Sequence, residues 1–155
     1  MRLGHVHFKT PRQFYWQTVS LQMFLISLSI ILLMGCATVA KKDPISLQNA
    51  IDLKVESLAL LDKATDPPDA HASEIQNMQL RIQKALEYEK SRGELNSIST
   101  QQWELLADPE GNLLAGFLKK WVADGKGRSA VFIDGVKGLV TKAFDQIIKV
   151  ESAKP

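Results

Sequence analysis

Apolar residues recur with the period of an α-helix over almost all of residues 45–151, and this regularity constrains the fold more than any other feature of the chain. No segment alternates between apolar and polar residues for long enough to predict a β-strand. Proline or glycine interrupts the pattern at residues 66–69, 93, 108–109 and 125–128, where helices can end. We therefore predict an all-α fold, an antiparallel helical bundle of four long helices and one short helix.

The first two predicted helices differ in the width of their apolar faces. The first, at about residues 45–65, has its main stripe at Leu47, Ile51, Val55, Leu58 and Leu61. Leu53 and Leu60 form a second line on its flank, which predicts contacts with two neighbouring helices. The second, at about residues 70–92 after a capping Asp69, has its stripe at Ile75, Met78, Ile82, Ala85 and Leu86. Because its other faces are rich in charge, we expect an outer helix.

A short helix and a longer one are predicted to follow. Residues 99–102, Ser-Thr-Gln-Gln, have the spacing of a capping box and predict the start of the short helix. Asp108, followed by proline, predicts the start of a helix at about residues 109–123. The apolar positions of this helix are Leu114, Phe117, Leu118, Trp121 and Val122. Trp103 and Trp121 are expected in the core, and either would be a candidate binding residue if it were exposed.

The last predicted helix has the widest apolar face in the chain. Ser129 is expected to cap it after a turn at residues 125–128, and it extends over about residues 130–151. Its apolar positions are Phe132, Ile133, Val136, Leu139, Val140, Ala143, Phe144, Ile147 and Ile148. A face this wide predicts neighbours on more than one side. Gly135 and Gly138 predict a close crossing with another helix, with a hinge as the alternative.

The segment before these helices is organised like a targeting signal. The chain has 19 basic and 17 acidic residues, and residues 1–35 hold three of the basic residues and none of the acidic ones. The basic excess therefore belongs to this segment, and we expect no nucleic-acid partner. An apolar run at residues 23–34 is shorter than the about 20 residues that span a bilayer. It matches the apolar region of a secretory signal, which has about 7–15 residues.

The apolar run ends at residues 33–36, Leu-Met-Gly-Cys, which resemble the lipobox of bacterial lipoproteins. The resemblance implies that the signal is cut between Gly35 and Cys36, that the Cys36 thiol receives a diacylglycerol and that the new amino group is acylated. Since the next residue is Ala37 rather than Asp, the resemblance also implies the inner leaflet of the outer membrane, facing the periplasm, in a Gram-negative host. Cys36 is the only cysteine, so a disulfide within one molecule is impossible. The alternative is a buried Cys36 in an uncleaved anchor helix.

These observations predict four parts of the chain: a signal peptide at 1–35, the lipidated cysteine and a tether at 36–44, the helical bundle at 45–151 and a C-terminal tail at 152–155. The short tether would hold the bundle close to the membrane. Its Lys41 and Lys42 either contact anionic head groups or belong to a solvated linker.

The sequence predicts no catalytic residues, no metal site and no cofactor other than the lipid. His71 has no second histidine or cysteine at helical spacing, so we expect it to pack or to cap a helix. Two carboxylate pairs, Glu87 with Glu89 and Asp108 with Glu110, are expected on solvated faces because residues two apart on a helix point in different directions.

One stretch of the sequence is a candidate interaction surface. The residues are Lys119, Lys120, Lys126, Arg128, Lys137 and Lys142, and they form either the solvated face of two helices or a surface for an anionic partner. We expect a non-enzymatic envelope lipoprotein whose helical module binds an envelope protein. The alternative is a small-ligand carrier or enzyme with an apolar pocket lined by Phe117, Trp121, Phe132 and Phe144.

Overall fold

The computed structural model describes residues 40–155, and the predicted signal and the lipobox-like segment lie outside these residues. The helices are α2 (Pro44–Asp62), α3 (Ala72–Ser91), α4 (Ser97–Ala107), α5 (Leu114–Asp124) and α6 (Ala130–Ala153). Three 3₁₀ turns, η2 (Lys63–Thr65), η3 (Pro68–His71) and η4 (Glu94–Asn96), lie in the connections. Over this part of the chain every regular element is helical, which confirms the all-α class.

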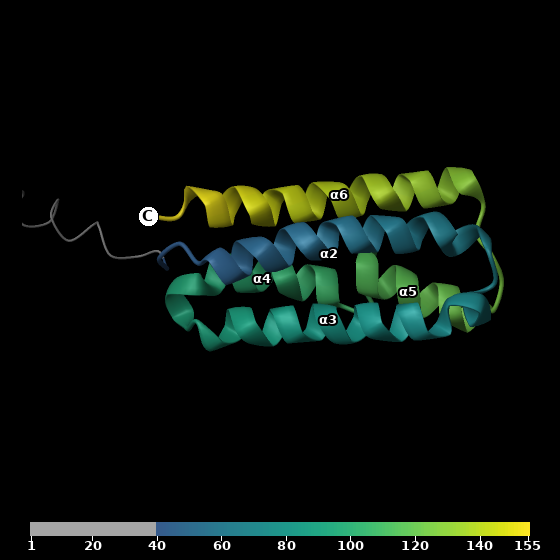
Figure 1. Ribbon diagram of the computed structural model, residues 1–155, viewed down its shortest axis with the longest axis horizontal. Helices are drawn as coiled ribbons and strands as arrows, with labels where there is room; N and C mark the ends of the chain where they lie inside the picture. The colour runs from purple at the N-terminus through teal and green to yellow at the C-terminus, as the bar shows by residue number, and fades with distance from the viewer. Residues whose placement is uncertain (1–39) are drawn as a thin grey trace, which may run out of the picture. The chain divides into compact units, whose positions relative to one another are not determined.

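The lengths of the helices differ from the prediction of four long and one short. Helices α2, α3 and α6 have 19, 20 and 24 residues, whereas α4 and α5 have 11 residues each. Helix α2 lies between α6 and α3, and α4 and α5 follow one another along α3 (Figure 1). The two short helices together occupy the place of one long helix. No helix within residues 40–155 is both long and apolar enough to cross a bilayer.

Helix α2 begins where its sequence directs, but it buries a different face from the predicted one. The Oδ1 atom of Asp43 accepts a hydrogen bond from the Ile45 amide at 2.7 Å, and Pro44 occupies the first turn. The flank line of Leu53 and Leu60 is buried, whereas Val55 of the predicted main stripe is 63% exposed and Ile51 is exposed too. Of the predicted main stripe, only Leu61 is fully buried, and the rest of the buried face is small: Ser46, Ala50 and Ser57. Because buried serines do not contribute to an apolar pattern, the apolar periodicity predicted a different face of α2 from the one that packs.

Helix α3 buries all five residues of its predicted stripe. It starts at Ala72, after the 3₁₀ turn η3, and Asp69 does not cap it. Its end agrees with the prediction, because Gly93 has a positive φ of 80°. A narrow apolar stripe leaves one choice of buried face, which explains why this prediction is confirmed.

Both predicted starts in the next region are wrong. Helix α4 begins at Ser97, and Ser99 lies buried within it rather than capping it. Helix α5 begins at Leu114, because Asp108 ends α4 and its Oδ1 atom accepts from the Glu110 amide at 2.9 Å in a turn. A Cβ atom on Gly116 would lie 2.0 Å from the carbonyl oxygen of Gly111, so the close return of this turn requires a glycine.

Helix α6 starts as predicted, and the Ser129 hydroxyl accepts from the Phe132 amide at 3.4 Å. Its buried face is narrower than predicted: Ile133, Val136, Val140, Phe144 and Ile147 are buried. Phe132 is 52% exposed and Leu139 is 49% exposed. No atom of another element lies within 4 Å of a Cβ placed on Gly135 or Gly138, so the predicted close crossing is wrong. The helix continues to Ala153, beyond the expected limit at residue 151.

Both tryptophans expected in the core are fully buried. Trp103 meets the ring of Phe144 edge to face at 5.9 Å between ring centroids, and Trp121 contacts Phe117 at 6.0 Å. By contrast, Val122 next to Trp121 is exposed, against the prediction. The centre of the bundle is therefore filled with aromatic and aliphatic side chains.

Candidate functional site

The six residues of the candidate interaction surface are distributed over α5, α6 and the turn between them, and half of them are neutralised by acids. Lys119 pairs with Glu110, and Lys137 pairs with Asp62. Arg128 pairs with Asp124 at 2.5 Å. Three of the six cations are therefore already paired with acids and do not offer an uncancelled charge to an anionic partner. The structure brings Lys120 and Arg128 together and leaves Lys119, Lys126, Lys137 and Lys142 outside their immediate surroundings.

Lys120 and Arg128 border a groove between α5 and α6. The groove has a volume of about 180 Å³ and is lined by Asn112, Phe117, Lys120, Arg128, Phe132, Val136 and Leu139. The rings of Phe117 and Phe132 stack with their centroids 6.3 Å apart. The guanidinium of Arg128 lies 5.8 Å from the centroid of the Phe132 ring, on the outer side of this apolar floor. We call this feature the α5–α6 groove.

Neutral groups hold both cations of the groove in place, and Arg128 is in addition paired with Asp124. The Lys120 ammonium donates to the Gly111 carbonyl at 3.3 Å and to the Asn112 side chain at 3.2 Å. The Arg128 guanidinium donates to the Lys120 carbonyl at 2.9 Å, and the Arg128 amide donates to the Ala64 carbonyl at 2.8 Å. Lys120 thus presents a positive charge that these neutral acceptors do not cancel. An apolar floor with a positive edge suits a partner that is both apolar and acidic.

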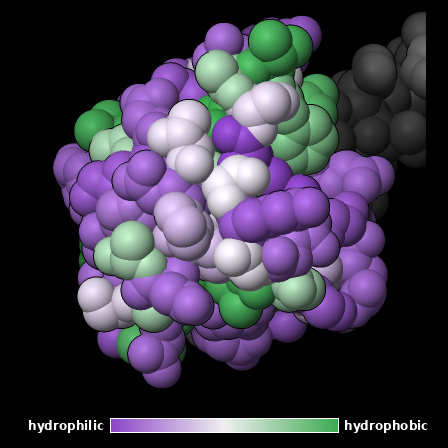
Figure 2. Space-filling model, turned by 90° about the vertical axis from the view of Figure 1, so that its right-hand side faces the viewer, coloured by the Kyte–Doolittle hydropathy of each residue, from purple (hydrophilic) through white to green (hydrophobic). Residues whose placement is uncertain are grey.

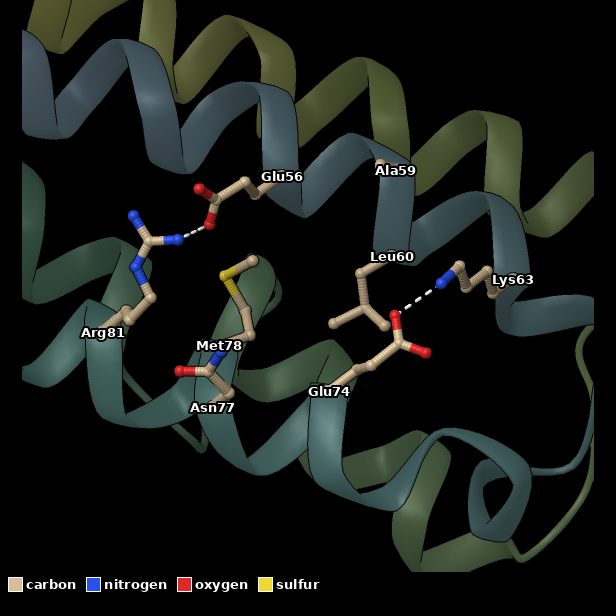
Figure 3. Close-up of a pocket in the computed structure, with 8 residues that line it drawn as sticks. All are labelled: Glu56, Ala59, Leu60, Lys63, Glu74, Asn77, Met78 and Arg81. Atoms are coloured by element: carbon tan, nitrogen blue, oxygen red, sulfur yellow. Dashed lines mark hydrogen bonds and ion pairs between the residues drawn. The ribbon is translucent and has the colours of Figure 1, made fainter.

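A second pocket lies between α2 and α3, and unlike the α5–α6 groove its charged side chains cancel one another (Figure 3). It has a volume of about 240 Å³, and its charged residues form two ion pairs. Glu56 pairs with Arg81, and Lys63 donates to Glu74 at 2.5 Å. In Figure 3 the two pairs lie on either side of Leu60 and Met78. Four charges that neutralise one another leave no net charge for a ligand to meet, so this pocket is the weaker candidate.

A cluster of buried charged and polar side chains lies where α2 begins and α6 ends, and sequence reasoning missed it. Its members are Ser46, Glu89, Arg92, Asn96, Ser99, Glu151 and Lys154, which we call the polar cluster. Glu89 and Glu151 are both 0% exposed. The expectation that Glu89 lies on a solvated face is therefore wrong. Lys154, expected in a C-terminal tail, is also buried.

Hydrogen bonds and ion pairs join the members of the polar cluster, which come from α2, α3, η4, α4 and α6 and from the residues next to them. Arg92 donates to Ser46 at 2.8 Å and lies 3.3 Å from both Glu89 and Glu151. The bonds of Lys154 are to Glu151 at 2.5 Å, Asn96 at 2.6 Å and Ser99 at 2.9 Å. One signal in the sequence could have identified the two carboxylates. Glu89 continues the stripe of α3 after the buried Leu86, and Glu151 continues the stripe of α6 one turn after the buried Ile147.

His71 packs against the ring of Trp121, with ring centroids 6.1 Å apart. Its two ring nitrogens lie 3.1 Å from Asp66 Oδ2 and 3.2 Å from Glu74 Oε1. These hydrogen bonds, first to Asp66 and then to Glu74, raise the pKa of His71 above its ordinary value of 6.5. The histidine is thus a packed residue in an acidic setting at the start of α3.

Within residues 40–155, the histidine, aspartate and glutamate side chains form no group of three or more that could hold a metal ion. No protein-family model matches the chain, and no curated protein or solved structure shows significant similarity to it.

Proposed function

We propose that the protein is a lipid-anchored lipoprotein of the bacterial cell envelope, and that its bundle is a non-enzymatic module that binds an envelope protein. The observation that carries the binding role is the α5–α6 groove on the surface of a filled core. The finer fold belongs to the same proposal: an antiparallel bundle in which α4 and α5 together replace one long helix.

The anchor is supported by the sequence alone. The lipobox-like residues 33–36 follow an apolar run and a basic segment, and Cys36 is the only cysteine of the chain. Two or three acyl chains on one residue anchor a protein stably, whereas one chain gives only marginal binding. Ala37 supports the inner leaflet of the outer membrane, facing the periplasm, in a Gram-negative host.

Fatty-acid labelling in growing cells tests the anchor. We expect the wild type to incorporate labelled palmitate and to fractionate with membranes, and Cys36→Ala to lose both properties. Equal labelling of the two proteins would contradict the assignment of the lipid to Cys36. Retention of Cys36→Ala in the membrane without label would support the uncleaved anchor instead.

The structure favours a binding module over a carrier. A carrier needs an enclosed apolar cavity of roughly 300 Å³ or more, and three of the four aromatic residues expected to line one lie in the core. Trp121 and Phe144 are 0% exposed and Phe117 is nearly so, which leaves Phe132 at the surface. The α5–α6 groove of about 180 Å³ suits one or two side chains of a partner segment better than a whole ligand.

The geometry of the groove specifies the chemistry of the partner segment. Its floor of Phe117, Phe132 and Leu139 would receive apolar side chains, and Lys120 at its edge would meet a carboxylate. We therefore expect an amphipathic, acidic segment, such as a helix with one apolar face.

Site-specific photocrosslinking in intact cells tests the binding role. A photoreactive residue at Leu139 should capture a protein, and the crosslinked peptide should carry acidic residues beside apolar ones. Lys120→Glu should abolish the capture. Lys142→Glu makes the same charge change on an exposed residue of α6 outside the groove, and should leave the capture intact. If no protein is captured and a small molecule copurifies, the carrier is the correct reading.

A further inference from the structure

One end of the bundle, which we call the proximal end, gathers residues 40–43, the η4 turn and the C-terminal end of α6 (Figure 1). Backbone hydrogen bonds fasten the first of these segments to the other two. The Ala40 amide donates to the Leu95 carbonyl at 3.0 Å, and the Lys42 amide donates to the Pro155 carbonyl at 2.9 Å. Residues 40–43 were expected to belong to a tether, but they are part of the packed structure.

The polar cluster also holds residues 41–43 against the bundle, through Arg92. The guanidinium of Arg92 donates to the Lys41 carbonyl at 2.6 Å and also lies 3.5 Å from the Asp43 carboxylate. The same guanidinium is held by the fully buried Glu89 and Glu151. The position of residues 41–43 on the bundle is therefore fixed by the same residues that join α3 to α6.

The proximal end exposes aliphatic side chains beside lysines. Leu95 in η4 is 56% exposed, and Ile98 in the first turn of α4 is 57% exposed. Lys41 and Lys42 are exposed on the neighbouring segment, while Glu94 is exposed beside Leu95. Glu94 offsets part of the charge of the two lysines, so we expect the aliphatic side chains to decide what this surface contacts. The opposite, distal end is covered mostly by hydrophilic residues (Figure 2).

The length of the chain specifies what covers this surface. Cys36 and Ala40 are four residues apart, and a fully extended chain of that length spans at most about 14 Å. An acyl group on Cys36 thus brings the acyl boundary of the bilayer within reach of Leu95. Aliphatic side chains at that depth are favoured, because the interfacial layer accepts apolar groups to about 5–10 Å.

We propose that the bundle stands on its proximal end, with Leu95 and Ile98 inserted into the interfacial layer of the bilayer that holds the lipid. This proposal rests on the proposed lipid anchor at Cys36, and it identifies a second, noncovalent membrane contact. The contact sets the orientation of the whole module. At a rise of 1.5 Å per residue along α6, the α5–α6 groove then stands about 20–30 Å above the bilayer, where a partner can reach it.

Depth-dependent fluorescence quenching tests the orientation. The full lipidated protein is reconstituted in vesicles of phosphatidylethanolamine and phosphatidylglycerol, and an environment-sensitive fluorophore is attached to Leu95→Cys or to Ile98→Cys. Because Cys36 carries the lipid, only the introduced thiol reacts. Val131→Cys, at an 84% exposed position at the start of α6, is the matched control. We expect lipids with a shallow nitroxide to quench the probe at both proximal positions several-fold more strongly than at position 131.

Each other outcome has a defined meaning. Equal quenching at positions 95 and 131 by a water-soluble quencher, in a protein that stays with the vesicles, would overturn the end-on orientation while the anchor stands. A probe at position 95 that is shielded equally in detergent and in vesicles would also overturn it, because a protein segment would then cover the surface. If Cys36 itself reacts with the thiol reagent and the protein leaves the vesicles, the proposed anchor has failed instead.

Discussion

The proximal and distal ends of the bundle are closed by different chemistry. At the proximal end, the largely buried Arg92 and the buried Lys154 hold the fully buried Glu89 and Glu151. At the distal end, the ring of His71 meets carboxylates that are substantially exposed, and a backbone turn packs against the end of α2. Removing one partner of a buried ion pair is strongly destabilising, because the other charge stays buried without compensation. Exposed ion pairs contribute little to stability, because water and salt screen them. The comparison indicates that the proximal end is the more rigid of the two, as the proposed orientation on the bilayer requires, and that the ion pairs of the distal end are open to solvent.

The largest effect is expected from breaking the polar cluster. Arg92→Met leaves two buried carboxylates without their shared cation, and removing one partner of a buried ion pair costs about 3–5 kcal/mol. We expect a loss of this size in the free energy of unfolding, measured with urea. Arg81→Met removes a half-exposed arginine paired with Glu56 and should cost less than about 1 kcal/mol. Equal losses would show that the two kinds of ion pair do not differ.

A smaller loss is expected from the backbone contact that closes the distal end. A Cβ atom on Gly127 would lie 1.8 Å from the Thr65 carbonyl oxygen, so Gly127→Ala must move the turn away from η2, which follows α2. Overpacking of this kind costs about 1–3 kcal/mol. Gly135→Ala is the control, because its Cβ meets open space within a helix and should stabilise by about 0.5–1 kcal/mol. If both substitutions stabilise, the turn is not held by this contact.

The distal end should also respond to pH near neutrality. Because the folded state raises the pKa of His71, its stabilisation is complete below about pH 6.5 and is lost as the pH rises through the folded pKa. We expect the free energy of unfolding to fall as the pH rises above about 6.5, and His71→Gln to remove that slope. Arg92→Met should keep the slope, since the polar cluster does not include His71. A slope that is unchanged in His71→Gln would assign it to another group.

The sequence predicts the helices of this fold better than it predicts their buried faces. Periodicity identified the buried face of α3, whose apolar stripe is narrow, through Ile75 and Ile82. It failed for α2, where apolar residues occur on several sides and the packed face includes the small Ser46 and Ser57. A local pattern cannot distinguish such faces, because the choice depends on which neighbour packs against them.

The candidate sites show the same limit. Of the six basic residues singled out by their spacing, only Lys120 and Arg128 line the groove, since their convergence depends on the turn before α6. The polar cluster was not predicted because Glu89 and Glu151 are 62 positions apart in the sequence, and only the folded chain brings both of them to Arg92. Whether a charged residue is buried can be predicted only when the tertiary fold shows which opposite charge lies beside it.

The smallest effect on stability is expected at Leu139, and it separates a binding surface from the core. A buried leucine costs about 2–5 kcal/mol when it is replaced by alanine. Leu139 lines the α5–α6 groove and is 49% exposed, so Leu139→Ala should change the free energy of unfolding by no more than about 0.5 kcal/mol. The fully buried Val140 provides the contrast, and Val140→Ala should destabilise measurably. In intact cells, Leu139→Ala should weaken capture of the partner by a photoreactive residue at Phe132, whereas Leu105→Ala, at an exposed leucine of α4, should not. A Leu139→Ala protein that loses stability but keeps its partner would place this face in the core and remove the groove from the binding role.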